Sequence, residues 1–344
     1  MSGMKFKFLG FLLAGFGFIH AQDYHLTQID KTMSILNPST VSMHQGFEKI
    51  SLQNRNQWLG SGTQFMTSYG MAELSVGKTK KSDKAYAGIG VFFSNDVGGD
   101  SKMSQKSFGT SFSGHLPLAK GHWLSAGIQT AFCNRSADFS RLVYYSQWNG
   151  SSLDPNVYSG EANDFTSFSY LDAGLGMNYR YIPGNKPNLS AGQFSFLGGF
   201  SIAHANKPSL NYNSLTDDRL FRKFCFNTQV KYAFDDRTSM EVSITELIQG
   251  AHKETILGLF YRSKLRGSSE ITNMVNSQSV VAGLYMRSMG ALAPYVALSF
   301  GSIDLGLSYD YDFGRIGSAY KHSIEVNVAY TFTKKSLFKG SRLH

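Results

Sequence analysis

The stretch Ile324–Phe332, IEVNVAYTF, decides the fold class, because its large apolar residues recur at every second position. Glu325, Asn327, Ala329 and Thr331 lie between them. A period of two is that of a β-strand with one apolar face and one polar face. In an exported chain without a long apolar helix, such a strand near the C-terminus predicts a transmembrane β-barrel.

The first 21 residues have the features of a secretory signal peptide. Lys5 and Lys7 precede an apolar run from Phe8 to Ile19, and the small residue Ala21 suits cleavage. A helix needs about 20 apolar residues to cross a bilayer, and this run is shorter. We therefore expect residues 1–21 to be removed after export and the mature chain to reach the outer membrane.

The composition favours a single barrel domain that is not a nucleic-acid reader. The chain has 35 Gly, 27 Phe and 18 Tyr but only 7 Pro, which suits long antiparallel strands with aromatic belts. Without Lys5 and Lys7, the 31 basic residues exceed the 24 acidic ones by 7. The basic residues lie mostly in candidate turns and in the C-terminal tail. Since no recognition motif accompanies the charge, we expect no nucleic-acid partner.

Alternating runs separated by Gly, Asn, Asp or Pro predict fourteen strands. They cover residues 47–56, 63–77, 84–95, 104–117, 121–134, 164–182, 192–205, 219–235, 237–247, 251–263, 277–289, 291–300, 302–312 and 320–333. An even number returns the chain to its side of entry, as a single-chain bacterial barrel requires. The phase of each run predicts an apolar outer face and a polar lumen that carries both signs of charge.

Connection lengths predict the orientation, because such barrels have short periplasmic turns and long external loops. With both termini in the periplasm, the longest connection, 135–163, is external. The connections 235–236 and Gly301 become short periplasmic turns. The connection 264–276 is too long for this scheme, so either that turn is elaborated or the strand count is wrong there.

Catalytic and metal-binding patterns are weak in this sequence. The 9 His residues are scattered without HExxH or C-x-x-C spacing, so we expect no metal and no cofactor. Ser113, His115 and Gln129 would face the lumen together, which is the minimum for a lipase-like site. Any serine-rich strand offers that coincidence, so we expect no enzyme. Cys133 and Cys225 both face the lumen by parity, and a disulfide between them stays open at this point.

Several motifs occur in a fixed order along the chain. Gln22–Gln28 opens the mature sequence, and Asn37 and Pro38 follow within Leu36–Pro38. The later positions are Arg55, Gln57 and Trp58, then Asp96, then Tyr309 and Asp310, and finally Glu325. Together they resemble the PorP/SprF family of Bacteroidota outer-membrane proteins. Tyr24, Ser39 and Asn54 depart from the residues usual in that family.

This resemblance implies a component of, or an accessory to, the type IX secretion system. Such proteins support secretion or cell-surface attachment of large surface proteins, including gliding adhesins in some organisms. The expected partners are the secretion machinery in the periplasm and outer membrane, the secreted cargo, and outer-membrane lipid. The alternative is a porin or a transporter of hydrophobic compounds.

The predicted organisation has four parts. Residues 1–21 form the signal peptide, and residues 22–46 form a periplasmic or plug-like segment. Residues 47–333 form the barrel, and residues 334–344 form a basic periplasmic tail. Segment 22–46 is too polar to span lipid, so we expect it to fold into the mouth or lumen, with Asn37 and Pro38 making a turn.

Overall fold

The computed structural model describes residues 26–60, 65–78, 84–161, 167–183, 189–211, 218–266, 278–288, 290–314, 322–333 and 336–337. The predicted signal peptide 1–21 and most of the predicted tail 334–344 lie outside these residues. Among the described residues, no helix is long and apolar enough to cross a membrane.

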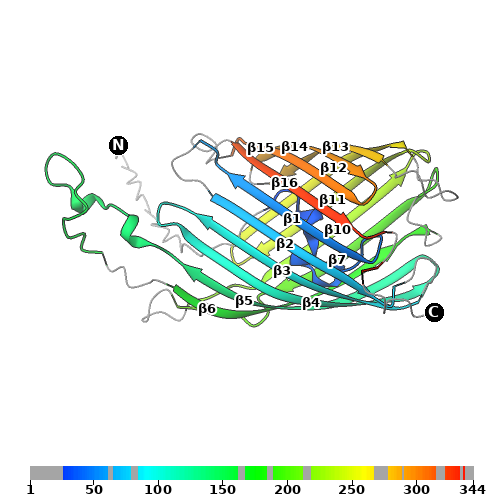
Figure 1. Cartoon of the computed structure of the whole chain (residues 1–344), viewed down its shortest axis with the longest axis horizontal. Coiled ribbons are helices and arrows are strands. Elements are labelled where there is room, and N and C mark those ends of the chain that lie inside the picture. Colours follow the sequence, from blue (N-terminus) through cyan, green and yellow to red (C-terminus); the bar gives the residue numbers. More distant parts are fainter. Residues whose placement is uncertain are drawn as a thin grey trace, which may run out of the picture.

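Fourteen antiparallel strands form a closed barrel, which confirms the predicted fold and strand number (Figure 1). They are β1 (Glu48–Gln57), β2 (Phe65–Val76), β3 (Tyr86–Gly98), β4 (Met103–Ala119), β5 (His122–Ser136), β6 (Ser167–Tyr181), β7 (Phe194–Ala203), β10 (Lys223–Ala233), β11 (Thr238–Gln249), β12 (His252–Arg266), β13 (Gln278–Arg287), β14 (Ala291–Phe300), β15 (Ile303–Asp312) and β16 (His322–Thr331). The strand count around the long connection 264–276 is therefore correct, and residues 267–277 lie outside the described residues.

The barrel closes between its first and last strands. β16 pairs with β1 from Lys49↔Thr331 to Asn56↔Ile324 and with β15 on its other side. The alternating stretch that predicted the barrel is thus the strand that removes its free edges, which an open sheet in a membrane would leave unsatisfied.

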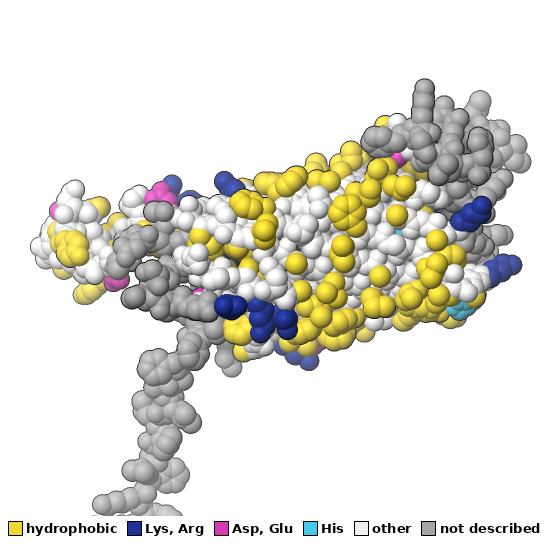
Figure 2. Space-filling model, turned by 90° about the horizontal axis from the view of Figure 1, so that it is seen from below, with side chains coloured by type: hydrophobic (Ala, Val, Ile, Leu, Met, Phe, Trp, Pro, Cys, Tyr) yellow, Lys and Arg dark blue, Asp and Glu magenta, His cyan; other side chains and the backbone are white. Residues whose placement is uncertain are grey.

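The predicted two faces of the wall are present along the strands. On the outer face Ile128, Leu171 and Leu307 are more than half exposed, and hydrophobic side chains cover much of the visible wall (Figure 2). On the inner face Ser125 and Asn178 are buried. Because side chains alternate across a strand, this phase fixes the register against lipid.

A small hairpin after β7 was not predicted. The predicted strand 219–235 is divided, because Asp218–Arg219 (β9) pairs with Ser209–Leu210 (β8), whereas β10 begins at Lys223. Leu210 and Leu220 pack with Tyr170 in a buried apolar cluster. Leu220 lies between β9 and β10, and its burial with Leu210 interrupts the predicted strand at this point.

Candidate functional site: the luminal plug

The segment 26–46, here called the plug, lies inside the barrel, and Figure 1 shows it in dark blue within the wall. It contains the turns Ile29–Lys31 (η1), Met33–Leu36 (α1) and Pro38–Thr40 (η2). Thr27, Gln28, Asn37, Ser39 and Val41 are completely buried. Polar residues tolerate such burial only when their hydrogen-bonding groups find partners, and here the barrel wall supplies them.

A buried charged cluster forms where the barrel closes. Arg55 Nη1 lies 2.7 Å from Asp310 Oδ2 and 3.1 Å from Glu325 Oε2. The three side chains are at most 1% exposed. They come from β1, β15 and β16, which are neighbours in the sheet. Pairing gives each charge a partner and offsets the large cost of removing it from water.

The plug completes this charged cluster with its own backbone. The amide of Thr27 donates to Glu325 Oε2 at 2.8 Å, and the amide of Gln28 donates to Oε1 at 2.7 Å. Thr27 Oγ1 also lies between Asp310 and Arg55. Both carboxylate oxygens of Glu325 therefore accept a hydrogen bond from the backbone of the plug.

The charged cluster continues along the neighbouring strands. Arg287 of β13 donates from Nε to Glu254 Oε1 of β12 at 2.7 Å, and its Nη1 lies 3.8 Å from Asp310. Nearby, Tyr285 donates to Asp30 of the plug, whose other oxygen pairs with Lys31 at 2.6 Å. Asp310 thus lies between Arg55 and Arg287, and the plug contacts this wall through Thr27, Gln28 and Asp30.

The opposite wall holds the plug with neutral groups. Asn37 Nδ2 donates to Asn227 Oδ1 at 3.1 Å, and Asn227 Nδ2 donates to Asn178 Oδ1 at 3.3 Å. Asn178 Nδ2 donates to Ser39 Oγ at 2.8 Å, and Ser39 Oγ donates back to Asn37 Oδ1 at 2.6 Å. These four residues form a closed ring of hydrogen bonds, in which each bond polarises the next. Asn37 also caps η2, with Pro38 as its first residue.

Glycines in the wall allow this close approach. A Cβ on Gly176 would lie 2.1 Å from Asn37 Oδ1, and a Cβ on Gly127 would lie 2.5 Å from the backbone carbon of Pro38. No larger residue fits at Gly127 without moving the plug backbone, so the glycine content of the strands has a specific use here.

Ser113 and His115 contact each other, with Ser113 Oγ 3.0 Å from His115 Nε2, and both also contact the plug. Ser113 Oγ donates to the carbonyl of Val41 at 2.9 Å, and His115 Nε2 lies 2.8 Å from the same oxygen. His115 Nδ1 is 2.8 Å from Ser125 Oγ. Gln129, the third candidate, contacts Ser111 and the carbonyl of Ile35. The Ser113 hydroxyl is buried between the Val41 carbonyl and the His115 ring.

The end of the plug is held by basic side chains at the end of the barrel where β1 begins. Lys78 Nζ donates to the carbonyl of Ser42 at 2.8 Å and also to that of His44. Arg180 Nη1 donates to the carbonyl of Met43 at 3.1 Å. Burial, helped by the nearby Arg180, lowers the pKa of Lys78 to about 7.

The structure brings together five of the nine family-motif positions. Asn37 and Pro38 lie in the plug, and Arg55, Asp310 and Glu325 lie around it. The other four are elsewhere, on the wall or at its outer rim.

These four positions have contacts of their own. Gln57 ends β1 opposite Phe65, and the backbone amide of Trp58 donates to Ser323 Oγ at 3.3 Å. Asp96 accepts a hydrogen bond from Thr67 Oγ1 at 2.6 Å. Tyr309 faces outward and is 42% exposed.

Sequence reasoning missed several residues that hold the plug. Asn227, Glu254, Tyr285 and Arg287 are inward by strand parity, and that alternation was the available signal. Nothing local shows which inward polar residue meets the plug. Cys133 and Cys225 form no disulfide, and among the described residues no cluster of His, Cys, Asp or Glu is arranged to hold a metal ion.

A family model described as type IX secretion system membrane protein PorP/SprF matches residues 19–330. The chain belongs to this family. The match spans the plug and the barrel of the PorP/SprF protein, up to the last residue but one of β16. Among curated proteins, none matches this chain.

Solved structures with a similar fold include two toluene transporters. TbuX of Ralstonia pickettii is 9% identical with a TM-score of 0.50, and the match covers 87% of this chain and 92% of that one. TodX of Pseudomonas putida is 10% identical with a TM-score of 0.50, covering 90% and 95%. At such low identity, the likeness of the PorP/SprF protein to these structures concerns the fold alone.

Proposed function

We propose that this PorP/SprF protein is a closed docking barrel of type IX secretion. It supports the secretion or surface attachment of large surface proteins without conducting them through its own lumen. The observation that carries this proposal is the plug, which is hydrogen-bonded to strands on opposite sides of the lumen, from β1, β15 and β16 to β4, β6 and β10.

The partner surface in this proposal is the long connection 137–161 between β5 and β6, here called the arm. It extends beyond the barrel at the end opposite the C-terminus (Figure 1). Its Tyr145 and Tyr158 side chains are 88% and 86% exposed, and Trp148 is half exposed. Exposed aromatic side chains outside the lipid belt are typical of protein interfaces.

The arm is ordered by its own hydrogen bonds, which prepares it for binding. Gln147 is buried at its centre and donates to the carbonyls of Pro155 at 3.1 Å and Val157 at 2.7 Å. A rigid surface loses less conformational entropy when a partner binds. A surface protein outside the membrane is the partner that this position favours.

A strain that carries a shortened arm tests the proposal. Replacing residues 139–159 with a short Gly-Ser turn should leave an inserted, heat-modifiable barrel but remove cargo from the cell surface. Cargo released into the medium would identify an anchor, and cargo retained in the periplasm would identify a secretion component. Normal surface display would contradict the proposal.

Point variants refine the same test. Tyr145→Ser combined with Tyr158→Ser should reduce surface cargo, whereas Ser152→Ala on the same arm should not. The double variant leaves the Gln147 hydrogen bonds in place, so its effect reports on the exposed aromatic side chains.

We propose that the protein is not an enzyme and not an open pore. Ser113→Ala should leave any phospholipase signal of the purified protein at background. In a planar bilayer the intact barrel should show no steady single-channel conductance, whereas a chain lacking residues 26–46 should conduct if it inserts. Steady conductance by the intact protein would favour the alternative, a diffusion channel.

A further inference from the structure

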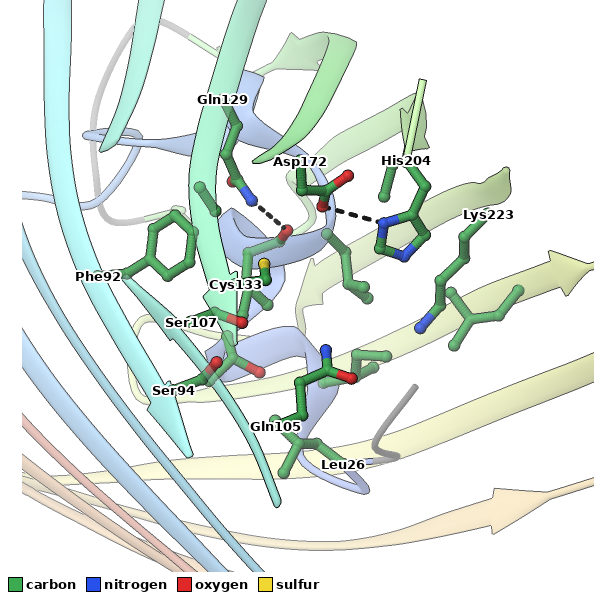
Figure 3. Close-up of a pocket in the computed structure, with 17 residues that line it drawn as sticks. Leu26, Phe92, Ser94, Gln105, Ser107, Gln129, Cys133, Asp172, His204 and Lys223 are labelled. Carbon is green, nitrogen blue, oxygen red and sulfur yellow. Dashed lines mark hydrogen bonds and ion pairs between the residues drawn. The ribbon is translucent and has the colours of Figure 1, made fainter. Parts of the chain in front are cut away.

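A cavity of about 70 Å³ lies on the outward side of the plug (Figure 3). Its wall includes Gln105, Asp172, His204 and Lys223, which belong to the outer parts of β4, β6 and β10 and to the residue after β7. Plug residues line the same cavity. The charged cluster and the asparagine ring leave this space unused.

The lining of the cavity is mainly apolar. Leu26, Ile29, Ile35 and Leu36 of the plug line it, and Phe92 adds an aromatic ring. Ala131, Cys133, Ala203 and Leu247 complete the apolar part. A cavity of this size has room for about five to seven waters.

Three polar oxygens in the cavity wall have no hydrogen-bond partner among the described residues. They are Thr32 Oγ1, Ser94 Oγ and Asp172 Oδ1. Thr32 and Ser94 are at most 1% exposed. The other oxygen of Asp172 lies 3.0 Å from His204 Nδ1. Buried oxygens without partners are costly, so a ligand that donates and accepts hydrogen bonds would relieve them.

His204 has a strained backbone beside this cavity. Its φ is 54°, a left-handed conformation that residues other than glycine rarely adopt. Together with the 3.0 Å contact between Nδ1 and Asp172 Oδ2, this conformation holds the imidazole in the cavity wall. Strain of this kind gathers where a side chain has to be placed for function.

We propose that this cavity binds a small phenolic molecule, a single apolar ring that carries one hydroxyl group. The ring would occupy the apolar part beside Phe92, and the hydroxyl would donate to Asp172 Oδ1 or exchange hydrogen bonds with Thr32 and Ser94. The Lys223 ammonium in the wall disfavours a cationic ligand, and the Asp172 carboxylate disfavours an anionic one. This inference is independent of the docking function.

Calorimetric titration of the purified full-length barrel with p-cresol tests the proposal, with toluene and benzylamine as comparison ligands. We expect p-cresol to bind and the two comparison ligands to bind more weakly. Thr32→Val together with Ser94→Ala should reduce the preference for p-cresol over toluene by roughly threefold to tenfold, because neutral hydrogen bonds are lost. Equal binding of p-cresol and toluene by the intact barrel would overturn the proposal.

A matched pair of alanines on β5 locates the binding. Ala131→Met fills the cavity and should abolish p-cresol binding, whereas Ala126→Met points outward and should leave it unchanged. Heat modifiability of both variants checks that the barrel is folded. Unchanged binding by folded Ala131→Met would place the ligand elsewhere and overturn the proposal.

The reactivity of the two cysteine thiols gives a test of binding that does not require the Ala131→Met variant. Cys133 lines the cavity, whereas Cys225 does not. Saturating p-cresol should slow the reaction of Cys133 with methyl methanethiosulfonate and leave that of Cys225 unchanged. If saturating p-cresol does not slow the reaction of Cys133, binding in this cavity is contradicted. If only N-acetyltyrosinamide slows it, the cavity binds a peptide side chain instead, which also contradicts the proposal.

Discussion

The two sides of the lumen hold the same plug with different chemistry. At the barrel closure the contacts are charged, with Arg55, Asp310 and Glu325 fully buried. On the other side they are neutral, made by the ring of Asn37, Asn227, Asn178 and Ser39 and by the carbonyl of Val41. This difference shows that two kinds of contact position the plug together. One is a small set of buried charges with a large desolvation penalty, and the other is a larger set of neutral groups with a small one.

The charged side stabilises the plug only while every buried charge keeps its partner. Removing one partner of a buried ion pair leaves a bare charge and costs about 3–5 kcal/mol, although replacing the whole cluster with apolar residues is often neutral. The stability that the neutral side provides depends on how many hydrogen bonds it makes, since each contributes only about 0.5–1.5 kcal/mol net. We therefore expect single substitutions to have unequal effects on the two sides.

The largest effect is expected for Glu325→Ala. This change leaves Arg55 with one carboxylate and removes the acceptor of the Thr27 and Gln28 amides, so unfolding should become easier by about 3–5 kcal/mol. Urea titration of the barrel in detergent measures the loss, and proteolysis measures the release of the plug.

Replacement of the whole charged cluster sharpens that result. A triple variant, Arg55→Met with Asp310→Leu and Glu325→Leu, should lose less stability than Glu325→Ala, because it leaves fewer unpaired charges. A greater loss in the triple variant would mean that the charges stabilise the barrel by themselves, apart from their pairing.

The next effect is expected for Gly127→Ala. Its new methyl group would meet the Pro38 backbone, so we expect a loss of about 1–3 kcal/mol from overpacking. Gly114→Ala on the neighbouring strand is the matched control, since nothing lies within 4 Å of its added Cβ. The temperature of the heat-modifiability transition should fall for Gly127→Ala alone. Equal shifts in the two variants would argue against contact with the plug.

A smaller effect is expected for Ser39→Ala. The change opens the ring of hydrogen bonds at its only hydroxyl, which should cost about 0.5–1.5 kcal/mol in urea titration. A loss as large as that of Glu325→Ala would show that the neutral side is as demanding as the charged one.

A pH dependence is expected through Lys78, which donates to the carbonyls of Ser42 and His44 at the end of the plug. The pKa of this lysine is about 7 in the folded protein and about 10.5 when unfolded. Between these values the unfolded chain binds more protons, so the free energy of unfolding should rise with pH from 7 to about 10. Titration curves of Lys78→Gln should lack this rise, and an identical rise in the variant would assign it to another group.

Much of the wall could be predicted from the sequence, because strand periodicity is a local property. Ile128 and Leu171 were predicted to face outward and do so, and all fourteen barrel strands were found. The interval 264–276 seemed to conflict with the topology, although the strands on either side of it were counted correctly. The β8 and β9 pair was missed, since two-residue strands carry no periodic signal.

The sequence by itself determined that this chain forms a barrel, which faces meet lipid, and that Glu325 points inward. Only the tertiary structure decided what Glu325 meets, because its partners Thr27 and Gln28 are 298 and 297 residues away along the chain. The plug consists of short turns without a repeating pattern, so its contacts follow from the shape of the closed lumen. The alternation of apolar and polar residues shows which face of a strand is polar. Only closure of the barrel brings the polar groups of different strands together.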